Sequence, residues 1–411
     1  CCMIEVLSYT MLKMLFKYIL ITISLLSIVV ADTINVPSDF PTIQGALNVA
    51  SNGDVIMIAE GTYFESNINP NGKIITITGE INDLGEPLVT IDGEYNESVL
   101  NFVVGFDYQT SNTSIIENLI IKKGSAFRGG GINAPFGLTI NNCIFDGNRA
   151  DYGAGVAFLG DNNAMTRIQN CVFKNQLEHS NPNFGYPELG SAINGNGNMT
   201  IANCIFENNA SLSIVVFIGG TVLIENCIFN NHFDGGELIS LTQSSTLTII
   251  NSNLINNDAF PISISGFSTA LLENNLFRNN TGTVSIMQSN ATINQCQFEN
   301  TELWIGEWYP INVSISDSEF CDNGGDAASD SIEGPWTDLG GNIFSDVCEE
   351  VIVGDINADG NINVIDVVQL VSFILGNTSP SENEVSAADL NSDGLLNILD
   401  VVALVNIILS S

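Results

Sequence analysis

The chain has 411 residues and a formal net charge of −36, from 46 Asp+Glu against 10 Lys+Arg. Such a charge excludes a surface that neutralises phosphates, so we expect no nucleic-acid partner and no binding to acidic membrane faces. Only 14% of the residues are charged and 45% are hydrophobic, which favours a packed core over a disordered chain.

Residues 1–31 are predicted to be an export signal. Lys13 and Lys17 precede an apolar run at residues 18–30, which is shorter than the roughly 20 residues that cross a bilayer. Small or branched residues at the end of the run suit cleavage before Asp32, and residues 1–10 are expected to lie upstream of the true start. We therefore expect a secreted, extracellular or cell-surface protein without a transmembrane segment after cleavage; an uncleaved anchor helix is the alternative.

The middle of the chain repeats one motif, Asn-Cys-Ile/Val-Phe, in perfect and degenerate copies whose spacing is mostly near 23 residues. This period is too short for helical repeats of about 33 residues or more. It matches one coil of a parallel β-solenoid, whose coils stack about 4.8 Å apart. Cys143 and Phe145 are two positions apart and share a face, which predicts an interior column of each type. The cysteine column is predicted to contain Cys143, Cys171, Cys204, Cys227 and Cys296, continued by Ser252 and Asn275.

The segment that precedes the repeats carries a family resemblance. Thr-Ile-Gln-Gly-Ala-Leu-Asn-Val-Ala at 42–50, Gly-Asp-Val-Ile at 53–56 and Gly-Thr-Tyr at 61–63 resemble the start of a right-handed parallel β-helix of the pectin-lyase-like superfamily. In that superfamily a short helix caps the end of the barrel. The resemblance implies an all-β domain at residues 32–348, a right-handed parallel β-helix of about 11–12 coils, and leaves its activity open.

The cysteines allow two interpretations. Export implies an oxidising compartment, yet an interior column of thiols packs well as small hydrophobic side chains, so free thiols are favoured while some pairing stays open. Cys321 and Cys348 lie outside the column and flank the last complete coil. We expect a disulfide between them that closes the C-terminal end of the barrel.

A twelve-residue pattern occurs twice near the C-terminus, at residues 355–366 and 389–400. Oxygen-bearing side chains at positions 1, 3 and 5, Gly at 6, a carbonyl at 7 and a carboxylate at 12 are typical of an EF-hand-type loop that binds Ca²⁺. The predicted ligands of two Ca²⁺ ions are Asp355, Asn357, Asp359, Asn361 and Asp366, and Asp389, Asn391, Asp393, Leu395 and Asp400. A helix is expected after each loop, at 364–375 and 398–409, and none before either loop.

Duplicated loop-then-helix units resemble a type I dockerin, which predicts a small α-helical, calcium-binding dockerin-like domain at residues 349–411. The resemblance implies a cohesin-like partner, because many dockerins attach secreted polysaccharide-degrading enzymes to cohesin scaffolds. Known dockerins often have Ser or Thr at positions 10 and 11, where this chain has Val364-Ile365 and Ile398-Leu399. These apolar pairs are expected to meet an apolar partner or the protein's own β-helix.

Catalysis by the β-helix is the least determined prediction. Hydrolases of polysaccharide need two carboxylates, and lyases need a Lys, Arg or His base with a cation. Six of the ten Lys+Arg lie within residues 122–174, interleaved with aspartates. The catalytic candidates there are Lys122, Arg128, Asp146, Arg149 and Asp151, with Asp161 nearby. His179 and His232 are expected to be solvated turn residues, and Trp304, Trp308 and Tyr309 either stack on sugar rings or pack the end of the barrel.

A rival function starts from Phe-x-x-Asn, which recurs at 145–148, 206–209, 277–280 and 320–323. These motifs resemble the repeats of polymorphic outer-membrane adhesins on the same fold, although turn-forming asparagines also explain them. Two functions therefore remain open: a secreted, carbohydrate-associated β-helix protein that acts on polysaccharide as a hydrolase or lyase, and a non-catalytic cell-surface adhesin or binding scaffold.

Overall fold

The structure is a computed structural model that describes residues 31–102, 114–134, 137–159, 165–178, 192–210, 214–217, 220–233, 236–306, 311–325, 327–348, 352–357, 359–380, 382–391 and 395–410. The chain divides into two compact units, one ending at Asp346 and the other comprising Val347–Ser411. In these described ranges, no helix combines the length and apolar character needed to cross a membrane. The predicted export signal lies outside them, apart from Ala31.

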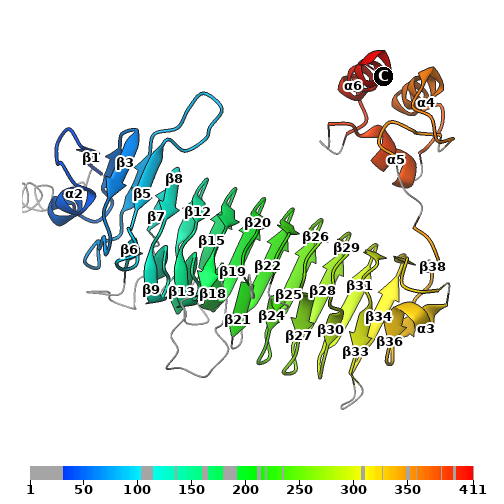
Figure 1. Cartoon of the computed structure of the whole chain (residues 1–411), viewed down its shortest axis with the longest axis horizontal. Coiled ribbons are helices and arrows are strands. Elements are labelled where there is room, and N and C mark those ends of the chain that lie inside the picture. The colour runs from blue at the N-terminus through cyan, green and yellow to red at the C-terminus, as the bar shows by residue number, and fades with distance from the viewer. Residues whose placement is uncertain are drawn as a thin grey trace, which may run out of the picture. The chain divides into compact units, whose positions relative to one another are not determined.

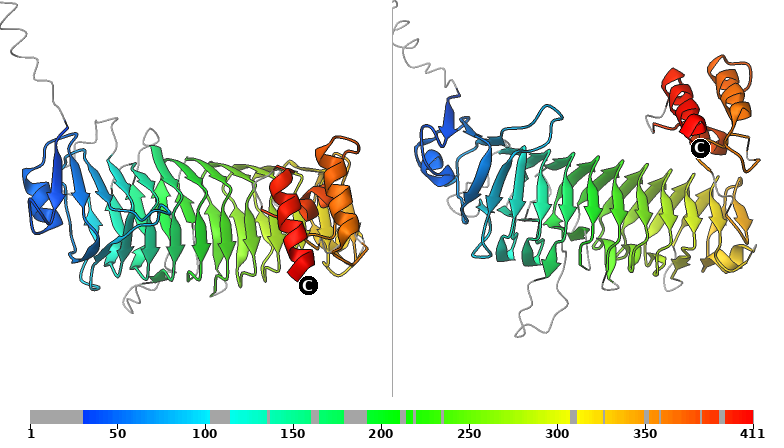
Figure 2. Two further views of the ribbon diagram at one scale, coloured as in Figure 1. Left: turned by 90° about the horizontal axis from the view of Figure 1, so that it is seen from above. Right: turned by 45° about the horizontal axis from the view of Figure 1, so that its top comes forward.

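The first unit is a stack of short parallel strands (Figures 1 and 2), and most of these strands bury one face against the interior of the coil. Its 13-stranded sheet runs β1 (Thr33–Val36), β2 (Val55–Ile58), β4 (Thr76–Gly79), β7 (Ile115–Glu117), β11 (Thr139–Asn141), β15 (Met165–Gln169), β19 (Asn198–Ala202), β22 (Thr221–Glu225), β25 (Thr246–Ile250), β28 (Thr269–Glu273), β31 (Asn290–Asn294), β34 (Val313–Ser316) and β37 (Thr337–Asp338).

The second long sheet has 12 strands: β3 (Gly61–Phe64), β5 (Val89–Asp92), β8 (Leu119–Lys122), β12 (Ile144–Asp146), β16 (Val172–Lys174), β20 (Ile205–Glu207), β23 (Ile228–Asn230), β26 (Asn253–Ile255), β29 (Leu276–Arg278), β32 (Gln297–Glu299), β35 (Glu319–Cys321) and β38 (Ile343–Ser345). Each coil contributes one strand, so these 12 strands enclose 11 turns and confirm the predicted parallel β-helix.

Two further sheets complete the coils. The 10-stranded sheet runs β6 (Leu100–Asn101), β10 (Ile132–Ala134), β14 (Val156–Leu159), β18 (Ile193–Asn196), β21 (Ile214–Phe217), β24 (Glu237–Leu241), β27 (Phe260–Ile264), β30 (Val284–Ile286), β33 (Leu303–Ile305) and β36 (Ile332–Glu333). A 3-stranded sheet consists of β9 (Ser125–Arg128), β13 (Arg149–Tyr152) and β17 (Leu177–Glu178). Its strands come from three successive coils in the N-terminal half of the β-helix.

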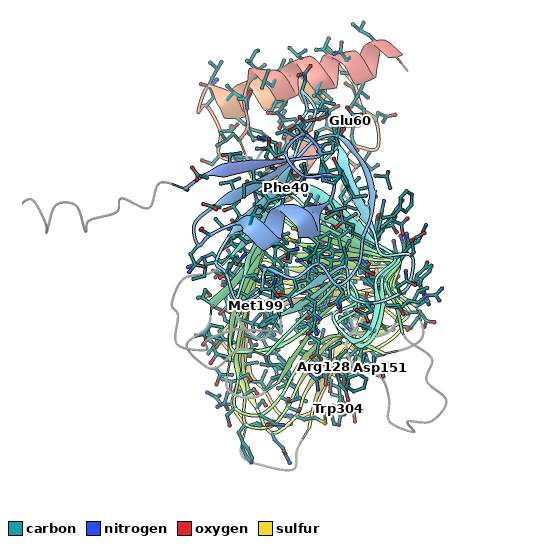
Figure 3. The ribbon with its side chains drawn as sticks, turned by 90° about the vertical axis from the view of Figure 1, so that its left-hand side faces the viewer. Phe40, Glu60, Arg128, Asp151, Met199 and Trp304 are labelled. Carbon is teal, nitrogen blue, oxygen red and sulfur yellow. The ribbon has the colours of Figure 1, made fainter. Side chains whose placement is uncertain are left out.

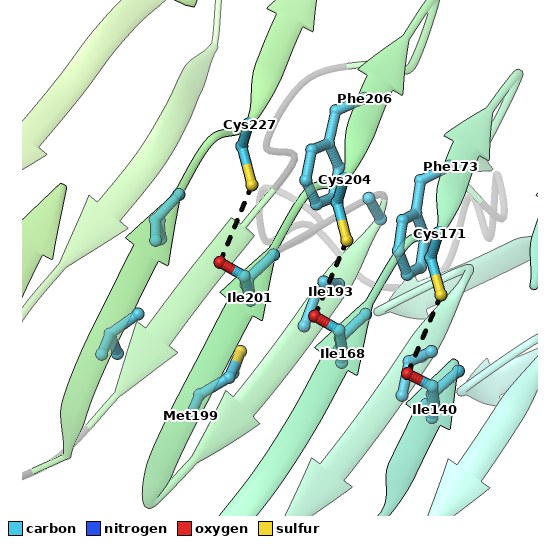
Figure 4. Close-up of a cluster of buried hydrophobic side chains, with 14 of the residues drawn as sticks. Ile140, Ile168, Cys171, Phe173, Ile193, Met199, Ile201, Cys204, Phe206 and Cys227 are labelled. Carbon is cyan, nitrogen blue, oxygen red and sulfur yellow. Dashed lines mark hydrogen bonds between the residues drawn. The ribbon is translucent and has the colours of Figure 1, made fainter. Parts of the chain in front are cut away.

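The predicted interior columns are present. Phe145, Phe173, Phe206 and Phe229 stack with ring centroids 4.6–5.0 Å apart, the spacing of the coils themselves. The five column cysteines are free and buried, and their thiols donate to carbonyl oxygens of the preceding strands, as at Cys171, Cys204 and Cys227 in Figure 4. The column continues through Ser252, Asn275 and Ser318, as predicted for the first two.

The asparagines of Phe-x-x-Asn form a second buried ladder, in agreement with the structural interpretation of this motif. Asn209, fully buried, donates from Nδ2 to the carbonyl of Phe173 at 2.9 Å, and its Oδ1 accepts from the backbone N–H of Gln176 at 3.0 Å. Asn148, Asn257, Asn280 and Asn323 make the same donation to the coil before them. These asparagines therefore satisfy backbone groups where the chain turns inside the barrel, and the motif is a folding element, not a surface repeat.

Short helices lie at both ends of the first unit (Figure 1). Helix α2 (Ile43–Val49) begins after the N-cap Thr42 and buries Ile43, Ala46 and Leu47, which is the capping helix that the resemblance implied. Helix α3 (Ala328–Ser331) lies at the other end, beside β36.

The second unit contains α4 (Val364–Ile374), α5 (Glu382–Ala388) and α6 (Ile398–Ser410) around a small core that includes Ile356, Leu370 and Leu404. Helices α4 and α6 confirm the two predicted helices. The expectation that no helix precedes either loop was wrong for the second loop, because α5 ends directly before it. Its sequence Glu-Asn-Glu-Val-Ser-Ala-Ala is short and polar, and helix α5 is stabilised by burying Ala387 and Ala388 in this core.

Candidate functional site

The first C-terminal loop is closed by two buried carboxylates. Asp355, 4% exposed, accepts hydrogen bonds from the backbone N–H groups of Asp359 and Gly360 at 3.1 and 2.7 Å. Asp366, fully buried, accepts from three backbone N–H groups of the same loop at 2.8–3.2 Å. Gly360 has φ +82°, so it supplies the bend between these two ends of the loop. Positions 1 and 12 are thereby held close together.

The second loop repeats part of this arrangement. Asp400 is fully buried and accepts from the backbone N–H groups of Leu390 and Asn397 at 3.1 and 2.9 Å. Asp366 makes the equivalent contacts, to positions 2 and 9, in the first loop. The predicted ligand Asp393 lies outside the described residues.

Position 9 of each loop has a role that the sequence reading missed. Asn363 Oδ1 accepts from the backbone N–H of Ile365 at 2.8 Å, and Asn397 Oδ1 accepts from that of Leu399 at 2.8 Å. Both asparagines therefore cap the helix that follows, which links the conformation of each loop to the start of α4 or α6.

Charge balance is the main reason to place a cation in these loops. Residues 347–411 contain ten Asp+Glu and no Lys, Arg or His, yet Asp355, Asp366 and Asp400 are buried. Buried carboxylates need an opposite charge or a metal ion, so the residues fit a hard, oxygen-bound cation such as Ca²⁺. Within the described residues, Asp, Glu, His and Cys side chains alone do not form a cluster of three. The coordination would therefore need amide and backbone oxygens as well, from Asn357, Asn361, Asn391 and Leu395.

Helices α4 and α6 each expose an apolar row that begins at positions 10 and 11 of the preceding loop. The exposed fractions are 66, 55 and 67% for Val364, Ile365 and Val368, and 65, 59 and 53% for Ile398, Leu399 and Val402. Positions spaced by three or four residues share one helix face. Apolar side chains left in water in this number mark an interaction surface.

Lys122 and Asp146, two of the catalytic candidates, belong to a ladder of alternating charge on the 12-stranded sheet. Successive strands align Asp92 with Lys122, Lys122 with Asp146, and Asp146 with Lys174. Asp92 is 2% exposed and lies 3.5 Å from Lys122 and 2.9 Å from Lys123. Burial alone would raise the pKa of Asp92, but the Lys123 ammonium and the N–H of Glu94 outweigh burial and lower it. The ion pairs of Asp92 and the alternation of charge between adjacent strands favour a structural role for Lys122 and Asp146.

Arg128 and Arg149 lie elsewhere, on the neighbouring strands β9 and β13 of the 3-stranded sheet. Arg149 lies over the ring of Tyr95, 4.3 Å from its centroid. Arg128 lies over the ring of Tyr152 at 4.5 Å, and Phe127 packs edge-on against Tyr152 at 5.3 Å. The sequence reading missed all three aromatic residues, although Phe127 and Tyr152 occupy adjacent coils and their spacing was a usable signal.

Of the remaining candidates, Asp151 lies with this group and Trp304 does not. Asp151 is 6% exposed and lies on β13, at the same corner of the coil as Arg128 in the view along the axis (Figure 3). Trp304 lies on β33, beside Ser285 of the neighbouring coil, near the other end of the barrel. Asp161, His179, Trp308 and Tyr309 lie outside the described residues.

His232 is not the solvated turn residue that was expected. It is 2% exposed and occupies the asparagine ladder, with Nε2 3.1 Å from the carbonyl of Phe206 and Nδ1 3.2 Å from that of Asn209. Burial lowers the pKa of His232 to about 4, against the opposing effect of these two carbonyls. The side chain is therefore a neutral ladder member at neutral pH.

The cysteines separate into two groups. Burial raises the pKa of Cys171 and Cys204, and it raises the pKa of Cys296 to about 11. The pKa of Cys227 is raised mainly by its hydrogen bond with the Cys204 thiol and secondarily by burial. Cys321 and Cys348 are disulfide-bonded. The free thiols agree with the predicted cysteine column, and the pairing of Cys321 with Cys348 stays a prediction.

Comparisons with known proteins agree with this architecture. The family model "Right handed beta helix region" matches residues 95–240 and 237–333, and "Dockerin type I domain" matches residues 353–409. No curated protein matches the sequence.

Among solved structures, the chain is similar to ORF18 of Geobacillus virus E2, with 16% identity, TM-score 0.43, and 72% of this chain and 62% of that chain covered. It is also similar to the PL6 family polysaccharide lyase Pedsa3628 from Pseudopedobacter saltans, with 13% identity, TM-score 0.44, and coverage of 77% and 93%. A third is the GH87 alpha-1,3-glucanase from Streptomyces thermodiastaticus strain HF3-3, with 13% identity, TM-score 0.36, and coverage of 74% and 65%. The chain spans less than two thirds of the viral protein and of the glucanase structure.

The first match covers more than half of the chain and coincides with the stacked parallel coils, and the second coincides with the paired loops and helices. The chain therefore belongs to the right-handed parallel β-helix family and carries a C-terminal type I dockerin domain, a calcium-binding module.

Proposed function

We propose that this is an extracellular, carbohydrate-associated protein in which a calcium-loaded dockerin attaches a polysaccharide-binding β-helix to a cohesin-like partner. The observation that carries the proposal is the pair of exposed apolar rows on α4 and α6. Each row starts next to a loop closed by a buried carboxylate, Asp366 or Asp400. Calcium would balance these carboxylates and hold the loops, and thereby the two helix starts, in the conformation that displays the rows.

Two Ca²⁺ ions, one in each loop, belong to this proposal. In the first loop Asp355, Asn357, Asp359 and Asp366 would supply side-chain oxygens and Asn361 its carbonyl. In the second, Asp389, Asn391, Asp393 and Asp400 would do so, with the carbonyl of Leu395. The role of the ion is structural: it neutralises the carboxylates of a unit that has no basic residue of its own.

The attachment is tested by measuring binding of the full chain to an immobilised cohesin domain with Ca²⁺ and with EGTA. The variant I365D/L399D places charge on both exposed rows and is expected to lower affinity at least tenfold, because desolvating a charge at an apolar interface is costly. F267D is the matched control, since Phe267 is 65% exposed but lies on the β-helix. Binding that survives EGTA, or equal loss in both variants, would refute the proposal.

We propose binding as the role of the β-helix, with cleavage of the polysaccharide as the alternative. Lys122 and Asp146 belong to the charge ladder, which leaves Arg128, Arg149 and Asp151, on the paired strands β9 and β13, as the described catalytic candidates. Cleavage is tested directly by incubating the protein with neutral and uronate polysaccharides and following reducing ends and unsaturated-product absorbance. Reducing ends alone would reveal a hydrolase, absorbance would reveal a lyase, and either result would replace the binding role with an enzymatic one.

A further inference from the structure

Some cations of the β-helix are paired with carboxylates, and two others lie on aromatic rings. Lys122 and Lys123 are paired with Asp92, and Arg278 is paired with Glu299. Arg128 and Arg149, by contrast, form no ion pair with any carboxylate in the described part of the chain, although acidic residues outnumber basic ones 46 to 10. Their guanidinium groups lie on aromatic rings instead. Two oriented positive charges therefore lack an anionic partner within the described structure.

The first pair, Arg149 on Tyr95, is presented by a strained turn. Glu94 and Tyr95 are consecutive residues with φ +52° and +60°, a conformation that costs of order 1 kcal/mol or more for each residue that is not glycine. The turn is held by hydrogen bonds from Glu94 N–H to Asp92 Oδ1 at 3.0 Å and from Tyr95 N–H to the carbonyl of Lys123 at 2.6 Å. Tyr95 stays 40% exposed beneath Arg149. This strained turn places the aromatic ring of Tyr95 at the surface.

The second pair, Arg128 on Tyr152, carries a further exposed ring. Phe127 is 53% exposed and its plane lies at 73° to that of Tyr152. Arg128 lies within 5.6 Å of the Phe127 centroid as well. Stacking and edge-to-face packing fix these side chains before any ligand arrives, which lowers the entropy cost of binding.

We propose that these two guanidinium–tyrosine pairs, Arg149 with Tyr95 and Arg128 with Tyr152, are subsites for acidic sugar residues of a polysaccharide. This inference rests on the proposed polysaccharide-binding function and names its site and ligand class. A planar guanidinium matches a carboxylate or sulfate with two parallel hydrogen bonds. The exposed aromatic rings supply apolar faces for the sugar carbons. At physiological salt, charges more than about 8 Å away are screened, so the net charge of −36 does not prevent contact-range binding.

The test is calorimetric titration of the calcium-loaded full chain with oligogalacturonates and with their methyl-esterified forms, which have the same sugar backbone without its charge. Sulfated carrageenan oligosaccharides and neutral agaro-oligosaccharides form a second arm, which separates carboxylate from sulfate recognition. R128Q and R149Q are each expected to weaken binding of the acidic ligand about tenfold, the effect of one charge-assisted hydrogen-bonded pair. The control is R167Q, because Arg167 is exposed on the 13-stranded sheet, away from both pairs, and should change affinity less than about twofold.

The outcomes separate this inference from the function on which it rests. Binding of an acidic ligand that both arginine variants weaken, with unchanged melting temperatures, supports the subsites. Binding that R167Q weakens as much, or that is equal for charged and uncharged forms of both arms, overturns the subsites and leaves polysaccharide binding intact. Absence of binding to any acidic or neutral polysaccharide overturns the function as well.

Discussion

His232 Nε2 lies 3.1 Å from the carbonyl oxygen of Phe206, in a buried column whose other members include Asn148, Asn209 and Asn257. Asparagine fills this column without titrating, whereas histidine brings a group whose charged form is disfavoured by burial. One coil of the barrel is therefore sensitive to pH in a way that its neighbours are not.

We predict that acid destabilises the β-helix partly through His232. Its pKa is about 4 in the folded protein against 6.5 ordinarily. Between these two pH values, His232 is therefore protonated in the unfolded chain and neutral in the folded chain. Above pH 6.5 the imidazole does not lower the free energy of unfolding. As the pH falls from 6.5 towards 4 the free energy of unfolding decreases, by roughly 2–3 kcal/mol at pH 4.5. Denaturation midpoints of the wild type and H232N at pH 7.0, 5.5 and 4.5 measure this. Titrating carboxylates change the stability of both proteins equally. Denaturation midpoints that fall in parallel with pH in the wild type and H232N would therefore contradict the prediction.

Removing calcium should unfold the dockerin while sparing the β-helix. Asp355, Asp366 and Asp400 would be left buried and uncompensated in a unit without basic residues. We expect EGTA to abolish the helical signal of α4 and α6 in circular dichroism, and excess Ca²⁺ to restore it. D366N and D400N should each remove one ion from the two expected in native mass spectrometry. A helical signal that is indifferent to EGTA would refute the role of the ion.

The column cysteines should resist modification in the folded protein. Burial raises the pKa of Cys171, Cys204 and Cys296, and a reagent must reach a thiolate. We expect none of Cys143, Cys171, Cys204, Cys227 and Cys296 to react with iodoacetamide under native conditions, and all five to react in denaturant. Rapid native labelling of any of them, located by peptide mass spectrometry, would show that the barrel opens there.

Cys321 and Cys348 are both disulfide-bonded, and we predict that they are bonded to each other. A non-reducing digest should then give one linked peptide pair that reduction splits. The double variant C321S/C348S should melt at a lower temperature, because the disulfide restricts the unfolded chain over a loop of about 28 residues, worth about 3.6 kcal/mol. A linked peptide that contains either cysteine with a different partner would disprove the pairing.

Repetition made much of this fold predictable from the sequence. The spacing of Asn-Cys-Ile-Phe placed Cys143 and Phe145 in interior columns, because side chains alternate along a strand and identical positions stack in successive coils. The loop patterns at 355–366 and 389–400 likewise predicted the start of each following helix, because capping and turn chemistry act over a few neighbouring residues.

Only the tertiary structure decided which charges are free. In the sequence, Lys122, Arg128, Asp146 and Arg149 form one cationic segment interleaved with aspartates. Folding separates them, because strand register places Lys122 and Asp146 in a ladder of alternating charge while β9 and β13 present Arg128 and Arg149 to aromatic rings. Tyr95 reaches Arg149 across 54 residues, and His232 enters a buried column of asparagines, by contacts between coils. The local sequence pattern determined the conformation of each coil. The stacking of coils determined which partners each side chain contacts.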